Sequence, residues 1–233
     1  MNPILITGVG QRVGLHLART FIDRGQPVIG TYRSQRDSIA ELGELGVELH
    51  HCDFYEDEQV QALIDSIAVK HSRLRAIIHN ASDWLPDSAD FAPEEILRRM
   101  MAVHVAAPYR INLGLADLLK AGAPADIVHL GDYVSTRGSK KHAAYAASKA
   151  AQDNLTLSFA AMLAPEVKVN SIAPALVLFN EDDDAEYREK TLKKSLMQRE
   201  GGLEEMQHQV DYLLESSYVT GRIIHMDGGR HLV

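Results

Sequence analysis

The amino-acid sequence predicts a three-layer α/β/α fold, in which helices cover both faces of a doubly wound parallel sheet. Short apolar runs alternate with helical patterns along the whole chain, and such alternation favours parallel strands joined by right-handed crossovers. A glycine-rich turn joins the first apolar run to the first helical pattern. The chain has 233 residues and 45% hydrophobic content, enough for one sizeable core. We therefore expect residues 1–233 to form a single domain.

Each element is predicted from its local pattern. Residues 12–24 have helical spacing because Val13, Leu17 and Phe21 share one face. Pro93 and Gly122 stand at the preferred start and stop of a helix. Strands are predicted at residues 3–7, 27–32, 47–53, 74–82, 126–132, 167–175 and 221–229. Helices are predicted at residues 12–24, 39–45, 57–71, 93–122 and 143–163, after residue 184, and at 203–216.

Composition narrows the class of function. The formal net charge is −8 and no long run of Lys and Arg occurs, so we expect neither nucleic acid nor a membrane as a partner. The single cysteine, Cys52, allows no intrachain disulfide and is expected to be a buried thiol. No leader sequence or membrane-length apolar run is seen, which favours a cytoplasmic protein. The histidines lack the spacing of a ligand set, and no metal site is predicted.

The turn "TGVGQRVG" at residues 7–14 predicts a dinucleotide site. Gly8 and Gly14 allow a sharp turn and close approach to a pyrophosphate, and the helix predicted at residues 12–24 directs unpaired N–H groups at the phosphates. A tight structural turn is the alternative. Arg12 adds a cation beside the diphosphate, within reach of a substrate lying over the cofactor.

The second strand ends in "GTYRSQ" with no acidic residue. An acidic residue there would bind the ribose 2′-hydroxyl of NAD, whereas Arg accommodates a 2′-phosphate. Arg33 and Ser34 therefore predict NADP(H) rather than NAD(H), with an ordinary surface cation as the alternative for Arg33.

A phenol and an amine lie four residues apart, at Tyr145 and Lys149, in a predicted helix. Residues at this spacing share one helix face. A nearby Lys⁺ favours the phenolate and is expected to lower the pKa of Tyr145. Asp132 lies thirteen residues before Tyr145. An ionised Asp there would repel a developing alkoxide, but it suits a substrate that offers N–H donors.

Four segments together resemble the short-chain dehydrogenase/reductase family. They are "TGVGQRVG", "HNAS" at residues 79–82, Tyr145-Ala-Ala-Ser-Lys149 and "VNSIAP" at residues 169–174, and they span nearly the whole chain in the family's order. The resemblance implies a Rossmann-type fold. The cofactor residues it implies, together with those above, are Gly8, Arg12, Val13, Gly14, Arg33, Ser34, Asp53, Asn80, Ala81, Tyr145, Lys149 and Pro174. Asp53 would contact the adenine, and Lys149 the nicotinamide ribose.

Two departures from the family pattern indicate its pteridine reductase branch. Most members have Ser where this chain has Asp132, and Gly where it has Arg12. The resemblance implies that Asp132, Tyr145 and Lys149 form the catalytic group. The only tryptophan, Trp84, would stack on a flat substrate ring against the nicotinamide; a core or rim position is the alternative. The substrate residues implied are Arg12, Ser82, Trp84, Asp132, Tyr145 and Leu176.

His104 is a further departure, since the family usually has Asn in that helix. A satisfied structural histidine and a direct catalytic role both remain open for it.

The resemblance implies NADPH-dependent reduction of a 7,8-dihydropterin to its tetrahydro form, with weaker reduction of dihydrofolate. A hydride would reach the imine carbon of the ring and a proton the neighbouring nitrogen. The alternatives are a carbonyl or 3-oxoacyl reductase of the same fold and a non-catalytic NADP(H)-binding sensor or scaffold. The resemblance also implies a substrate lid at about residues 175–200, against a solvated excursion as the alternative, and a homotetramer in which Arg230 and His231 could reach a neighbouring site.

Overall fold

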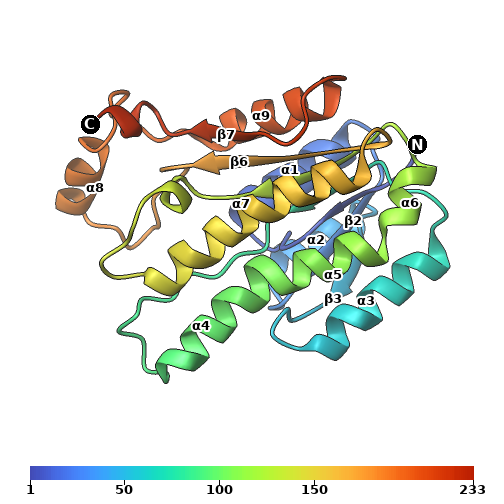
Figure 1. The fold of residues 1–233 in the computed structure, drawn as a ribbon, viewed down its shortest axis with the longest axis horizontal. Helices are drawn as coiled ribbons and strands as arrows, with labels where there is room; N and C mark the ends of the chain where they lie inside the picture. Colours follow the sequence, from blue (N-terminus) through green and yellow to red (C-terminus); the bar gives the residue numbers. More distant parts are fainter.

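A computed structural model of residues 1–233 contains one seven-stranded sheet in which every strand pair is parallel. The strand order is β3-β2-β1-β4-β5-β6-β7, with helices on both sides of the sheet (Figure 1). The strands are β1 Ile4–Ile6, β2 Val28–Tyr32, β3 Glu48–His51, β4 Ala76–His79, β5 Ala125–Leu130, β6 Val167–Pro174 and β7 Ile223–Met226. The predicted fold class is confirmed.

The α-helices are α1 Arg12–Asp23, α2 Asp37–Glu44, α3 Asp57–Lys70, α4 Pro93–Met101, α5 Ala107–Gly114, α6 Ala116–Ala121, α7 Ala143–Leu163, α8 Ala185–Leu192 and α9 Leu203–Glu215. Short 3₁₀ turns lie at Tyr133–Thr136 and Arg230–Leu232. None of these helices has both the length and the apolar character needed to cross a bilayer.

Two apolar cores lie on opposite faces of the sheet, because successive strand side chains point to opposite sides. Leu5 of β1 belongs to a core formed with α3, α5, α6 and α7. Its neighbours Ile4 and Ile6 belong to the other core, formed with α1, α2 and α9. The β1, β4 and β5 side chains in both cores are fully or almost fully buried, as expected for the centre of a covered parallel sheet.

The helix predicted at residues 93–122 is not one helix. A π-helical turn at Ala102–Ala106 separates α4 from α5, and Leu115 separates α5 from α6 with φ −110° and ψ 8°. Pro108 explains the first interruption, because proline has no N–H to donate to the carbonyl four residues earlier, and its ring clashes with that carbonyl. That carbonyl belongs to His104, which therefore sits on a widened turn.

The sheet order creates a crevice at the carboxyl ends of the central strands. The chain runs outward from β1 to β2 and β3, then returns to place β4 on the other side of β1. The loops after β1 and β4 therefore diverge, and ligands of open α/β sheets bind at such a point.

Candidate active site

A cavity of about 560 Å³ lies at this crevice. It is lined by Gly8, Gly10, Gln11, Arg12, Val13, Thr31, Tyr32, Arg33, Ser34, Arg36, Cys52, Asp53, Phe54, Tyr55, Asn80, Ala81, Ser82, Asp83, Trp84 and Val103. The lining comes chiefly from the loops that follow β1, β2, β3 and β4. Most residues predicted to contact cofactor therefore border one space.

The glycine-rich turn is tied to the loop after β4. Gly8 has φ +74°, and a Cβ atom added there would lie 2.9 Å from the Cα of Ala81. The Thr7 hydroxyl accepts from the backbone N–H groups of Asn80 and Ala81, at 3.0 and 2.9 Å. The Asn80 amide donates to the Thr7 and Gly8 carbonyls. Gly8, Asn80 and Ala81 therefore fix the shape of the crevice, in addition to the cofactor contacts predicted for them.

The start of α1 fits a phosphate group. Gln11 caps the helix with no side-chain hydrogen bond, and the first turn has no acidic residue, so its free N–H groups are available to an anion. The guanidinium-bearing residues Arg33 and Arg36 line the same cavity. A diphosphate and an adjoining phosphate both match this donor set.

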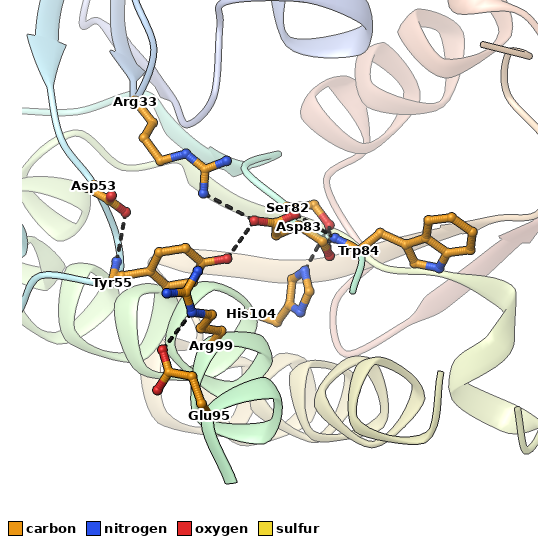
Figure 2. A network of polar contacts seen from close by, with 9 residues as sticks. All are labelled: Arg33, Asp53, Tyr55, Ser82, Asp83, Trp84, Glu95, Arg99 and His104. Atoms are coloured by element: carbon orange, nitrogen blue, oxygen red, sulfur yellow. Dashed lines mark hydrogen bonds and ion pairs between the residues drawn. The ribbon is translucent and has the colours of Figure 1, made fainter. Parts of the chain in front are cut away.

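Arg33 is held by two residues that sequence reasoning missed (Figure 2). It forms an ion pair with Asp83 at 3.1 Å, and the Tyr55 hydroxyl donates to the same carboxylate oxygen of Asp83 at 2.5 Å. The pair joins the loop after β2 to the loop after β4, across the end of β1 that lies between them. The sequence offers one indication of this ion pair, which is that Asp83 stands between the predicted site residues Ser82 and Trp84.

Asp132, Tyr145 and Lys149 are brought together next to the cavity, although none of the three lines it. The Tyr145 hydroxyl donates to Oδ2 of Asp132 at 2.7 Å. The other oxygen, Oδ1, accepts from the backbone N–H of Val134 at 2.8 Å, which fixes the carboxylate at the start of a 3₁₀ turn. The Lys149 ammonium is buried and donates to the carbonyl of Leu130 at 2.8 Å and to Gln152 at 3.2 Å.

The expected pKa of Tyr145 is wrong for this structure. Burial, and then the charge and hydrogen bond of Asp132, raise the pKa of the phenol well above 10 instead of lowering it. The spacing placed Lys149 on the correct face, but its Nζ lies 5.9 Å from the centre of the Tyr145 ring, while the carboxylate contacts the hydroxyl directly. Burial lowers the pKa of Lys149 itself to about 8.

His104 connects the cavity wall to this group. Its ring is fully buried, with Nε2 at 2.8 Å from the Ser82 hydroxyl and Nδ1 at 2.9 Å from the Ser148 hydroxyl. The ring edge also contacts Tyr145, with 5.4 Å between centroids and an interplanar angle of 80°. His104 is therefore a satisfied buried histidine that contacts a predicted substrate residue.

Trp84 is 59% exposed and lines the cavity, so the core position considered for it is excluded. One face of its indole stacks on His142, with 4.1 Å between centroids and an interplanar angle of 15°. In Figure 2 the indole points away from Arg33. His142 was not predicted, because a stack between residues so distant in sequence leaves no local pattern.

The Arg12 side chain extends from the cavity and hydrogen-bonds to the polar segment after β6. Its guanidinium donates to the Leu178 carbonyl and to Oδ1 of Asn180, each at 2.9 Å, and the residue has φ 52°. The contact with this segment differs from the expected contact with the diphosphate.

Besides Asp132, Tyr145 and Lys149, three predicted residues do not line this cavity: Gly14, Pro174 and Leu176. Gly14 packs against the turn itself, since a Cβ atom added there would lie 2.2 Å from the Gly8 carbonyl oxygen. Leu176 borders a second cavity of about 410 Å³ between the polar segment and the chain around β7, and Pro174 ends β6 and pairs with Met226. The remaining predicted residues Val13, Ser34 and Asp53 line the main cavity. Asp53 also accepts from the Tyr55 backbone N–H at 3.0 Å. Cys52 is buried, and burial raises the pKa of its thiol to about 12.

The geometry agrees with comparisons to known proteins. A family model described as enoyl-(acyl carrier protein) reductase matches residues 8–231. The chain is 52% identical, over 99% of its length and 97% of the relative's, to a dihydromonapterin reductase of Escherichia coli O6:K15:H31, and equally to that of Shigella boydii serotype 4. The chain belongs to the short-chain dehydrogenase/reductase family. The further resemblance to bacterial dihydromonapterin reductase, visible in "HNASDW" and "MAVHVAAPY", is confirmed.

Solved structures of this family have the same fold. A structure described as FolM alternative dihydrofolate reductase 1 from Brucella canis, complexed with NADP, superposes with a TM-score of 0.88 at 26% identity, covering 100% of this chain and 94% of that one. An NADP complex of RhlG from Pseudomonas aeruginosa gives a TM-score of 0.88 at 24% identity, covering 99% of this chain and 96% of that one.

Proposed function

We propose that this short-chain reductase reduces 7,8-dihydromonapterin, and other dihydropterins, to the tetrahydro form with NADPH, and that it reduces dihydrofolate more weakly. The observation that carries the proposal is the Tyr145 hydroxyl bonded at 2.7 Å to the carboxylate of Asp132. A carboxylate at this place accepts hydrogen bonds and suits a ring with N–H groups, whereas a ketone oxygen needs donors. The names of the relatives at 52% identity support the same substrate class.

The cofactor would extend along the crevice. The N–H groups of the first turn of α1 and the glycine-rich turn would hold its diphosphate, Arg33 and Ser34 its 2′-phosphate, and Asp53 its adenine. Lys149 has two of its three ammonium donors engaged and would offer the third to the nicotinamide ribose. The NADP complex of the Brucella relative supports the choice of cofactor.

When bound, NADPH supplies a hydride to the imine carbon of the dihydropterin. The chain's own residues hold the ring and provide the proton for the neighbouring nitrogen, which completes the C–H and N–H bonds of the product. Tyr145 stays protonated beside Asp132, so this pair would hold a proton at the phenolic oxygen and pass it on directly or through water. Trp84 would hold the flat ring against the nicotinamide, with His142 supporting the opposite face of the indole.

Three further features belong to the proposal. Residues 175–200 would form a substrate lid over the site, held to the glycine-rich turn by Arg12. The enzyme would act as a homotetramer in the cytoplasm. Apolar side chains exposed on α7, Leu157 and Met162, would lie at a subunit interface.

The test follows NADPH oxidation by its absorbance with 7,8-dihydromonapterin, dihydrobiopterin, dihydrofolate, a 3-oxoacyl ester and an enoyl thioester in parallel. We expect the highest kcat/KM with dihydromonapterin and little turnover of the two acyl substrates. Turnover of an acyl substrate with none of any dihydropterin would overturn the proposal in favour of a carbonyl or enoyl reductase. NADPH binding with no turnover of any substrate would favour the sensor alternative.

A further inference from the structure

The buried contact between His104 and Ser82 determines which way the Ser82 hydroxyl points. Serine can either donate or accept a hydrogen bond, and a ligand recognises these two states differently. Ser82 lines the cavity, while His104 lies behind it with no exposure to solvent. Figure 2 shows the imidazole below Ser82, with one ring nitrogen aimed at the hydroxyl.

The direction of the bonds follows from the far side of the ring. The Ser148 hydroxyl donates to the carbonyl of Tyr145 at 2.7 Å, and a carbonyl can only accept. The single Ser148 proton is therefore used, so the contact of 2.9 Å between Ser148 and Nδ1 of His104 requires a proton on Nδ1.

The near side of the ring must then accept. Burial, and then the charge of Lys149, lower the pKa of His104 well below 6.5, so the imidazole is neutral and carries one proton. With that proton on Nδ1, Nε2 has a lone pair, and the 2.8 Å contact is a bond donated by Ser82. The other acceptor near Ser82 is the carbonyl of Asp83, at a longer 3.4 Å.

We propose that His104 is a positioning residue that holds Ser82 as an obligate hydrogen-bond acceptor, so that Ser82 selects a substrate by its N–H donor. The inference rests on the proposed function. It adds to that function the edge of the pterin ring that Ser82 would recognise. With the proton of Ser82 directed at His104, only lone pairs of its oxygen face the cavity. Among the groups of a pterin ring, the 2-amino group and the neighbouring ring N–H are the donors that match.

The first experiment tests the direction of the hydrogen bond between Ser82 and His104, and it needs no substrate. Protein labelled with ¹⁵N-histidine is examined by long-range ¹H–¹⁵N correlation at pH 7, and the His104 signals are assigned by their loss in His104→Gln. We expect a neutral ring with the proton on Nδ1. A proton on Nε2, or a doubly protonated ring, would overturn the inference and leave the proposed reaction untouched.

The second experiment tests the consequence. The ratio of kcat/KM for a dihydropterin to that for its 2-desamino-2-methyl analogue is measured in the wild type, Ser82→Ala, His104→Leu and the double variant. One hydrogen bond to an acceptor is worth roughly tenfold in this ratio. We expect each single variant to lose the preference for the dihydropterin over its analogue. The double variant should lose no more of this preference than either single variant does.

Additive losses in the double variant, or a preference that survives in Ser82→Ala, would contradict the inference. If His104→Leu does not fold, the kinetics of Ser82→Ala and the ¹⁵N measurement on the wild type still test the inference. Failure of the proposed function would look different, since neither the dihydropterin nor its analogue would then be turned over.

Discussion

At the scale of single residues, the carboxylate of Asp132 dominates the chemistry of the site. It accepts a hydrogen bond from the Tyr145 hydroxyl at 2.7 Å, and its other oxygen accepts one from the backbone N–H of Val134. Its charge raises the pKa of Tyr145 and also acts to raise that of Lys149. One substitution at Asp132 should therefore change the behaviour of both neighbours.

Replacing Asp132 by Ser should reduce kcat/KM for a dihydropterin by about 10²–10⁴-fold, since an acid or base partner contributes roughly this much. The dissociation constant of NADPH should change by less than about twofold, because Asp132 does not line the main cavity, where the cofactor is proposed to bind. The pKa of Tyr145 should fall, since the nearby charge and hydrogen bond are lost. Steady-state kinetics, NADPH fluorescence titration and tyrosinate absorbance measure these effects, with Tyr145→Phe as the control for the absorbance signal. An equal loss of NADPH affinity would indicate a structural role for Asp132.

Replacing Arg33 by Ala should raise the KM for NADPH by about 10–100-fold and leave that for NADH nearly unchanged, because a charge-assisted contact to a phosphate is worth about 1.5–3 kcal/mol. The matched control is Arg19→Ala, an exposed pair partner of Glu41 that does not line the cavity. If both cofactors weaken equally, Arg33 acts through its ion pair with Asp83 and not through the 2′-phosphate.

Residues were predictable where function leaves a local pattern. The shared face of Tyr145 and Lys149 follows from helical spacing, and the shape of the turn that contains Gly8 and Gly14 follows from its place between a strand and a helix. Asp83, Tyr55 and His142 were missed because each acts through a partner distant in sequence: the Tyr55–Asp83 contact spans 28 residues, and His142 stacks on Trp84. The pKa of Tyr145 was misjudged for the same reason, since spacing fixes a face but not the distance between two atoms.

At the scale of elements, the long helices differ in how well their sequence defines them. Residues 143–163 were predicted with the bounds that α7 shows, because no internal residue opposes the helix. Residues 93–122 were predicted as one helix, although Pro108 interrupts it with a π turn. That turn carries His104, so the element that departed from prediction is also the one that positions a group behind the cavity wall.

Arg12 is the residue of the glycine-rich turn that hydrogen-bonds to the segment after β6. Its guanidinium donates to residues 178–180. Arg12→Gly should leave the fold intact, because Gly adopts φ 52° more readily than Arg does. It should raise the KM for the pterin and increase hydrogen exchange in residues 176–184. Asn180→Ala removes one of the bonds and should give a smaller change in both measurements. Unchanged exchange in Arg12→Gly would show that the contact does not hold the segment.

At the scale of the whole molecule, the two ends of the sheet serve different purposes. The carboxyl ends of the strands form the cavity, while Asp126, near the start of β5, is buried and pairs with Arg75 and Lys168. These two cations also donate to the carbonyls of Leu214 and Leu213 in α9. The cluster therefore connects β5 and its neighbouring strands to a helix on one face, at the opposite end of the strands from Asp132 and Tyr145.

Replacing Asp126 by Ala should lower the free energy of unfolding by about 3–5 kcal/mol, because it leaves two cations without their buried partner. The activity per folded molecule should be unchanged. Glu41→Gln removes an ion pair in which both side chains are more than 40% exposed, and should cost less than about 1 kcal/mol. Denaturant unfolding of both variants checks the contrast, and equal effects would mean that burial does not determine the contribution of an ion pair here.

The fold also buries histidines that are neutral, two in the sheet and one on the π-helical turn, and this predicts how the whole molecule responds to acid. Burial lowers the pKa of His79 to about 4, and it lowers the pKa values of His104 and His129 as well. An unfolded histidine titrates near 6.5, so below that pH the unfolded chain binds protons that the folded chain does not, and stability falls as pH falls. For His79 alone the loss should reach about 2 kcal/mol by pH 5, and the other two act in the same direction. Denaturant unfolding from pH 7.5 to 5 measures the slope, which should become shallower in His79→Gln and stay unchanged in the control His208→Gln. A wild-type stability that is flat over this range would mean that the buried imidazoles accept protons without opening the fold.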